Sequence, residues 1–179
     1  MGFMNTFDTL RKCQASLIIE EIDKNPFPCI FVEKELMYIN YNNEVVKLVQ
    51  DAISTPLPDI NDLHRGLSEK IYQVIPYDID ESKENQILQL MPHSKKTRWH
   101  PLAIDVIPNN GGKQNGILKV LEHYQIDINE TMSFGDGMND LDMFSLTPIS
   151  VAMGNASEEV KSHASYVTDD IDDDGLYNA

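Results

Sequence analysis

Short runs of apolar and polar residues follow one another along the chain, and their spacing predicts a first region of mixed helices and strands. Apolar residues at helical spacing predict a helix over residues 6–24 and a second helix after Asn43, a favoured N-cap residue. Between them, FPCIFVEKELMYINY predicts two short strands joined at residues 33–35. The region therefore opens with a helix, a strand pair and a second helix.

The first region continues with a loop and further elements. TPLPDIND contains two prolines and predicts a loop. KIYQVIPYDI predicts a strand, ESKENQILQLM a helix, and TRWHPLAIDVIP a strand pair bent at Pro101. We therefore expect an α+β domain over residues 1–106.

The pattern of apolar and polar residues changes after IPNNGG. The spacing predicts an amphipathic helix over residues 113–124, a strand at TMSF, a helix over residues 140–146, a strand at ISVAMG, a helix at SEEVKSHA and a strand at SYVTD. Strands that alternate with helices are typical of a parallel, doubly wound α/β sheet. We therefore predict a domain boundary near residue 106 and a β-α-β-α-β domain over residues 107–179.

Composition excludes several classes of partner. The 179 residues are 41% hydrophobic, enough for a packed core, and carry a net charge of −15, which disfavours binding to nucleic acids or anionic membranes. No apolar stretch approaches the ~18 residues of a membrane span. The two cysteines lack a CxxC spacing and fit a reducing cytoplasm. We expect a cytoplasmic protein that needs a cation to hold any phosphate.

The candidate chemistry lies in the run GDGMND at the end of the TMSF strand. Ligands of α/β sheets bind at the carboxyl ends of strands, where Asp136 falls. Asn139 and Asp140 begin the next helix, whose exposed amides favour anions. Two carboxylates beside an anion suit Mg²⁺ that bridges to a phosphate, whereas the simpler alternative is a helix N-cap with turn glycines.

Lys113 supplies a candidate cation for the same site. It begins its own helix directly after NNGG, 136 − 113 = 23 residues before Asp136. If the two strands are neighbours, its ammonium group can reach the pocket and offset phosphate charge. The alternative is an ordinary solvated lysine.

The run GDGMNDLDMFSLTPISVAMGNASEEVKSHASYVT, with IPNNGGK ahead of it, resembles the second half of a haloacid dehalogenase (HAD) superfamily phosphatase of the Cof type. The likeness covers residues 107–179, while residues 1–106 more loosely resemble the α/β cap of that family. It implies a Mg²⁺-dependent phosphatase that hydrolyses small phosphorylated metabolites through an aspartyl-phosphate. By the same resemblance, Asp136 binds the metal and Asp140 supports it, Asn139 binds phosphate, and Lys113 is the catalytic, phosphate-binding cation.

The attacking aspartate of that family belongs to a DxDGT strand, which this sequence does not contain. The run over residues 172–175 has similar letters but follows a polar segment; together with Asp170 it also imitates half of an EF-hand loop. Asp78 and Asp80 suggest a strand end or a helix cap. We therefore expect an N-terminally truncated phosphatase, inactive alone, with an exposed sheet edge that favours self-association.

Arg98 and His100 are the candidate substrate-selecting residues, because they lie just before the return from the cap to the core. The guanidinium of Arg98 suits a second anionic group, and the alternative is a solvent-exposed Arg98 beside a Trp99 that packs at the hinge. Two other functions remain open, a non-catalytic metal- and phosphate-binding module and a phosphomutase, whereas a P-type cation pump, which also has a GDGxND run, does not fit. The pump would require transmembrane helices and a DKTGT run, and neither is present in this sequence.

Overall fold

The computed structural model describes residues 9–179 and divides the chain into two compact units, residues 1–110 and 111–179. The predicted boundary at residue 106 falls inside strand β5 (Ala103–Pro108). Strand β5 pairs with two other strands of the first unit, so the division follows the end of that strand by two residues.

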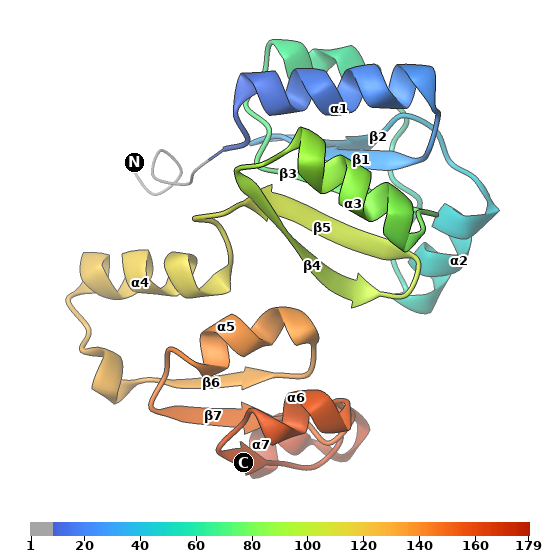
Figure 1. Cartoon of the computed structure of the whole chain (residues 1–179). Helices are drawn as coiled ribbons and strands as arrows, with labels where there is room; N and C mark the ends of the chain where they lie inside the picture. Colours follow the sequence, from blue (N-terminus) through green and yellow to red (C-terminus); the bar gives the residue numbers. More distant parts are fainter. Residues whose placement is uncertain (1–8) are drawn as a thin grey trace. The chain divides into compact units, whose positions relative to one another are not determined.

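The first unit contains a five-stranded antiparallel sheet in the order β2-β1-β3-β5-β4 (Figure 1). The other four strands are β1 (Cys29–Val32), β2 (Met37–Ile39), β3 (Gln73–Pro76) and β4 (Ser94–His100). The mixture of this sheet with helices confirms the α+β arrangement predicted for the first region.

The two faces of this sheet carry different helices. Helices α1 (Lys12–Lys24) and α3 (Glu81–Leu90) pack on one face, together with the 3-10 helix η2 (Leu63–Leu67). Helix α2 (Glu44–Ala52) packs on the other face, called here the α2 face. Side chains alternate between the faces as strand geometry requires, with Phe31 on the α1–α3 side and Ile30 on the α2 face.

Most elements predicted for the first region are confirmed. Asn43 caps α2 by accepting a hydrogen bond from the amide of Val46 at 2.9 Å, and β4 and β5 are separated at Pro101. The first helix begins later than expected, at Lys12, because the amide of Leu10 donates to the carbonyl of Ile71 instead of entering a helix. Residues 6–8 of that prediction lie outside the described part.

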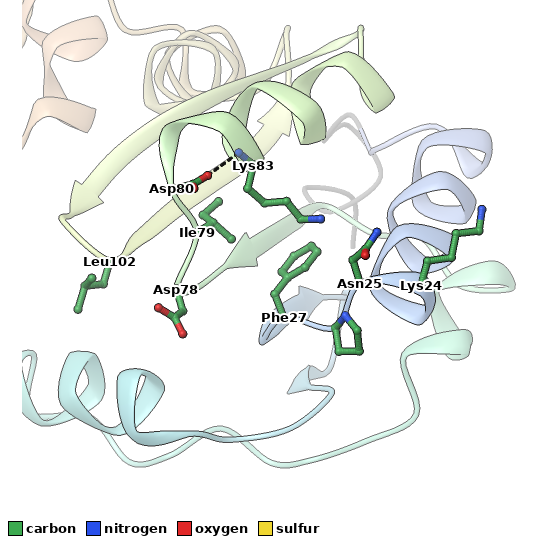
Figure 2. A pocket seen from close by; sticks show the side chains of 9 residues that line it. Lys24, Asn25, Phe27, Asp78, Ile79, Asp80, Lys83 and Leu102 are labelled. Carbon is green, nitrogen blue, oxygen red and sulfur yellow. Dashed lines mark hydrogen bonds between the residues drawn. The ribbon is translucent and has the colours of Figure 1, made fainter.

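A hollow of about 690 Å³ lies where α1 ends and α3 begins (Figure 2). Lys83 reaches across it, donating to Glu21 at 2.5 Å and lying 5.1 Å from the ring centroid of Phe27. That hydrogen bond lowers the pKa of Glu21. Asp80 caps α3 by accepting from the amide of Lys83 at 2.8 Å, as the helix-cap interpretation predicted.

The second unit contains a three-stranded parallel sheet in the order β6-β7-β8, which confirms the predicted parallel α/β texture. Its strands are β6 (Met132–Gly135), β7 (Ile149–Ala152) and β8 (Tyr166–Val167). The helices are α4 (Lys113–Tyr124), α5 (Leu141–Phe144), α6 (Glu158–Ser162) and α7 (Gly175–Asn178), and the 3-10 turns are η3 (Ile128–Glu130), η4 (Met138–Asp140) and η5 (Ile171–Asp173). Within residues 9–179, β6 pairs on one side only, with β7.

One part of the second unit differs from expectation, and the acidic run after β8 agrees with it. The helix predicted over residues 140–146 is split into η4 and the shorter α5. The acidic run after β8 forms η5 and α7, so it neither ends an apolar strand nor follows the helix of an EF-hand. In the part of the chain that the structure describes, no helix is long and apolar enough to cross a membrane.

His64 links η2 to α1 through two carboxylates. Its Nδ1 lies 2.9 Å from Asp62 and its Nε2 lies 3.2 Å from Asp23. The hydrogen bonds to these carboxylates, that of Asp62 first, raise the pKa of His64. The imidazolium form therefore stabilises the folded state, and this contribution is complete below the ordinary pKa of about 6.5.

We expect the His64→Gln variant to melt at a lower temperature than the wild type below about pH 6.5. The difference should shrink as the pH rises through the raised pKa of His64, because the neutral ring loses its attraction to Asp23 and Asp62. Melting curves at several pH values measure this. His93→Gln is the control, and an H64Q deficit that grows with pH would contradict the ion-pair interpretation.

Candidate functional site

The loop after β6 is closed by the side chain of Asp140. One carboxylate oxygen of Asp140 accepts hydrogen bonds from the backbone amides of Asp136, at 3.0 Å, and Gly137, at 3.1 Å. The residue is only 3% exposed. The amides of Asp136 and Gly137 are therefore already satisfied by a buried carboxylate. This contact also explains the 3-10 turn that replaces the start of the predicted helix.

Gly135 is required by the close approach of Asp140. A Cβ atom at this position would lie 2.5 Å from a carboxylate oxygen of Asp140 and 2.6 Å from its Cβ. Such contacts are shorter than van der Waals packing permits, so a larger residue would displace the carboxylate from the loop.

Lys113 pairs with the second carboxylate oxygen of Asp140. The lysine side chain is 48% exposed while that of Asp140 is 5% exposed, so the pair has one buried and one open partner. The first turn of α4 is held near α5 by Asp142, which accepts from the amide of Gln114 at 3.3 Å. The structure thus brings Lys113 to the Asp136–Asp140 loop from 23 residues upstream.

Asp136 points its carboxylate outward, in contrast to Asp140. It is exposed, and one of its oxygens accepts a hydrogen bond from the side-chain amide of Asn155 at 3.0 Å. Within residues 9–179, its other oxygen has no protein donor. Asn155 was not predicted as a site residue, although its position three residues after β7, at the same end of the sheet as Asp136, is a usable signal.

Asn139 lies between the two aspartates in η4 and is partly exposed. No hydrogen bond joins its side-chain amide to another group in residues 9–179. The amide is therefore available to a ligand, whereas the carboxylate of Asp140 is already engaged by Lys113 and two backbone amides.

These residues supply some, but not all, of the ligands of a divalent cation. In residues 9–179 no group of three or more His, Cys, Asp and Glu side chains converges to hold a metal. Asp136 offers one oxygen, and both oxygens of Asp140 are already engaged. Mg²⁺ accepts such a sparse set, because it commonly binds one or two carboxylates, keeps several waters and takes further oxygens from a phosphate.

The model of the haloacid dehalogenase-like hydrolases matches residues 5–179. The chain belongs to this family. Within it, the chain is 34% identical over 161 residues to a Bacillus subtilis protein provisionally named a phosphatase, which covers 89% of this chain and 61% of that protein. It is 31% identical over 124 residues to a second B. subtilis protein, a 5-amino-6-(5-phospho-D-ribitylamino)uracil phosphatase, covering 68% of this chain and 43% of the relative.

Solved structures of the HAD superfamily share the fold. A sugar phosphatase of HAD subclass IIB superposes with a TM-score of 0.83 at 34% identity, covering 94% of this chain and 65% of that one. A structure from a study of trigonal-bipyramidal intermediates in a phosphoryl-transfer superfamily gives a TM-score of 0.86 at the same identity and coverage. The chain therefore spans less than two thirds of the length of the B. subtilis relatives and of these structures.

Arg98 and His100 belong to the first unit of this HAD-family chain, where both are engaged in local contacts. One terminal nitrogen of Arg98 donates to the carbonyls of His100, at 3.0 Å, and Pro101, at 2.8 Å, and the other pairs with buried Glu84. The ring of His100 lies 3.1 Å from the amide of Leu102. Arg98 is therefore paired rather than simply solvated, and a role of either residue in substrate selection stays a prediction.

Replacement of Gly135 tests the dependence of the loop on Asp140. We expect Gly135→Ala to lower the free energy of unfolding of the second unit by about 1–3 kcal/mol, because the added methyl group displaces a buried hydrogen-bonded carboxylate. Denaturant unfolding followed by circular dichroism measures this free energy. Tryptophan fluorescence would not report on the second unit, because the only tryptophan, Trp99, lies in the first unit.

Gly116→Ala is the matched control. Gly116 lies inside α4 with no atom within 4 Å of an added Cβ, so alanine should stabilise that helix by about 0.5–1 kcal/mol. Equal effects of the two substitutions would contradict the role assigned to Gly135.

Proposed function

We propose that this chain provides the metal- and phosphate-binding part of a Mg²⁺-dependent phosphatase for small phosphate esters. One observation carries the proposal: exposed Asp136 lies in a loop whose shape is fixed by buried Asp140, which pairs with half-exposed Lys113. A carboxylate, an open ammonium group and an unpaired amide at the carboxyl end of one strand match the needs of a phosphate with its counterion.

Each residue of the loop has a separate part in this proposal. Asp136 holds Mg²⁺ through its unpaired oxygen, while Asn155 fixes the other oxygen. Bound Mg²⁺ neutralises phosphate charge and polarises the phosphorus–oxygen bonds. Lys113 adds positive charge and Asn139 donates a hydrogen bond to a phosphate oxygen. Asp140 supports the metal by shaping the loop, because its own oxygens are committed.

Hydrolysis also needs a nucleophile, which the family resemblance assigns to an aspartate of a DxDGT strand. We propose that such a strand, from outside these 179 residues, pairs with the outer edge of β6. Its carboxylate would displace the alcohol from phosphorus, and water would then hydrolyse the aspartyl-phosphate. A hollow of about 600 Å³ leaves room beside Asp136 at the carboxyl end of β6, and its lining includes Met153, Ile171, Leu176 and Tyr177.

The substrate class follows from the relatives only in general terms. One relative is named for a phosphorylated ribityl-uracil and one structural neighbour is a sugar phosphatase. We propose a small phosphorylated metabolite as the substrate. Binding without turnover is the second candidate function, favoured by the lack of a DxDGT run in this sequence.

Calorimetric titration with Mg²⁺, in the presence and absence of inorganic phosphate, tests the half-site. We expect phosphate to tighten Mg²⁺ binding, and Asp136→Asn to weaken it about tenfold, equivalent to about 1.4 kcal/mol. Lys113→Ala should reduce the effect of phosphate more than it reduces Mg²⁺ binding itself, because the lysine faces the anion directly and acts on the metal only through its pair with Asp140.

Asp172→Asn is the control, since it removes a carboxylate from the exposed acidic run after β8. Equal loss of Mg²⁺ binding in the Asp136 and Asp172 variants would show non-specific attraction by a chain of net charge −15. It would therefore contradict the proposed metal site.

A further inference from the structure

A second hollow, of about 540 Å³, opens on the α2 face of the first unit. Its floor and one wall are apolar side chains of the sheet, Ile30, Ile75 and Trp99, and a segment with two prolines after α2 forms another wall. All its lining residues belong to the first unit, and the Asp136 loop belongs to the second.

The mouth of this hollow exposes apolar side chains to water. Met37, Ile53 and Leu57 line it and are 53%, 43% and 47% exposed. Clustered exposed apolar residues around a concave surface are typical of a binding site. Asp59 is the charged residue among those that line the hollow, and its carboxylate disfavours an anionic ligand.

One wall carries a chain of three polar side chains. The hydroxyl of Thr55 donates to the side-chain carbonyl of Gln50, and the amide nitrogen of Gln50 donates to the hydroxyl of Tyr77 at 2.9 Å. The chain leaves the Tyr77 proton without an acceptor and the Thr55 oxygen without a donor among residues 9–179. If the oxygen and nitrogen of the Gln50 amide are exchanged, Thr55 keeps the unpaired proton and Tyr77 the unpaired oxygen. The chain still has one donor and one acceptor at its two ends.

The other groups of the site are fixed in form and place. Burial raises the pKa of Tyr77 to about 12, so its hydroxyl stays protonated and able to donate at neutral pH. The indole nitrogen of Trp99 donates to Asp105 at 2.8 Å, which holds the ring as a rigid apolar wall. A flat ligand therefore meets a surface that does not have to be ordered on binding.

We propose that this hollow binds a flat, uncharged ring with an amide edge, an N–H group beside a carbonyl. The ring packs against Trp99 and the neighbouring aliphatic side chains, and the N–H and carbonyl pair with the two ends of the Thr55–Gln50–Tyr77 chain. An uncharged ring satisfies the unpaired donor of buried Tyr77 and the unpaired acceptor of exposed Thr55, and it places no second negative charge beside Asp59. The site requires neither Mg²⁺ nor phosphate.

Fluorescence of Trp99, the only tryptophan of the chain, measures occupancy directly. The probes are uracil, which has the amide edge, and 1,3-dimethyluracil, which keeps the flat ring but has no N–H group. We expect a saturable change with uracil and about tenfold weaker binding of the dimethyl compound, because its ring leaves the acceptor of the wall unpaired. No saturable change with uracil, or equal binding of the two probes, would overturn the proposal.

Two variants locate the binding. Tyr77→Phe and Thr55→Val should each weaken uracil binding about tenfold. Thr55 lies in an exposed loop, so its variant should keep the wild-type melting temperature. Tyr38→Phe is the control, because it removes a hydroxyl from a buried tyrosine on the α1–α3 side of the same sheet. The proposal fails if Y38F weakens binding as much as Y77F, or if T55V leaves binding unchanged.

These measurements are made without Mg²⁺ or phosphate. A chain that binds uracil but not Mg²⁺ would therefore contradict the proposed phosphatase site alone, and the converse result would contradict the ring site alone.

Discussion

The buried carboxylate of Asp140 is the constraint on which the candidate site depends. A buried carboxylate is costly unless every oxygen is paired, and here one oxygen faces Lys113 while the other accepts from two loop amides. Pairing draws the loop inward around Asp140, requires a glycine at position 135, and leaves Asp136 on the outside. The position of exposed Asp136 therefore depends on the contacts of buried Asp140.

Parallel strand pairing supplies the second part of the arrangement. Because β6 and β7 run side by side in the same direction, the segments that follow them meet at one edge of the sheet. This brings Asn155 to Asp136, while Asp142 ties the first turn of α4 to α5 and so places Lys113. The first unit uses its sheet differently, with helices α1 and α3 on one face and a concave, partly apolar surface on the other.

Local patterns predicted the elements of this chain well. The periodicity of residues 113–124 predicted the bounds of α4 that are observed, and Asn43 and Pro101 marked a helix start and a strand break correctly. These features depend on residues close in sequence. The GDGMND run also indicated the family, which the match over residues 5–179 confirms.

Apart from the approach of Lys113 to the loop, contacts between distant residues could not be predicted in the same way. The sequence gives no sign that Glu84 pairs with Arg98, or that Asp140 occupies the loop amides rather than leaving them to an anion. Asn155 was visible as a residue after a strand, yet its bond to Asp136 depends on strand order. The boundary predicted near residue 106 falls inside β5, because the pairing of β5 with its neighbours is a tertiary property.

Amide hydrogen exchange at Asp136 and Gly137 tests the central role of Asp140 most directly. In the wild type both amides should be strongly protected, since they donate to a buried carboxylate. In Asp140→Ala both should exchange rapidly while the amides of β7 stay protected. Rapid exchange of both amides in the wild type, or unchanged protection in the variant, would contradict the claim that Asp140 organises the site.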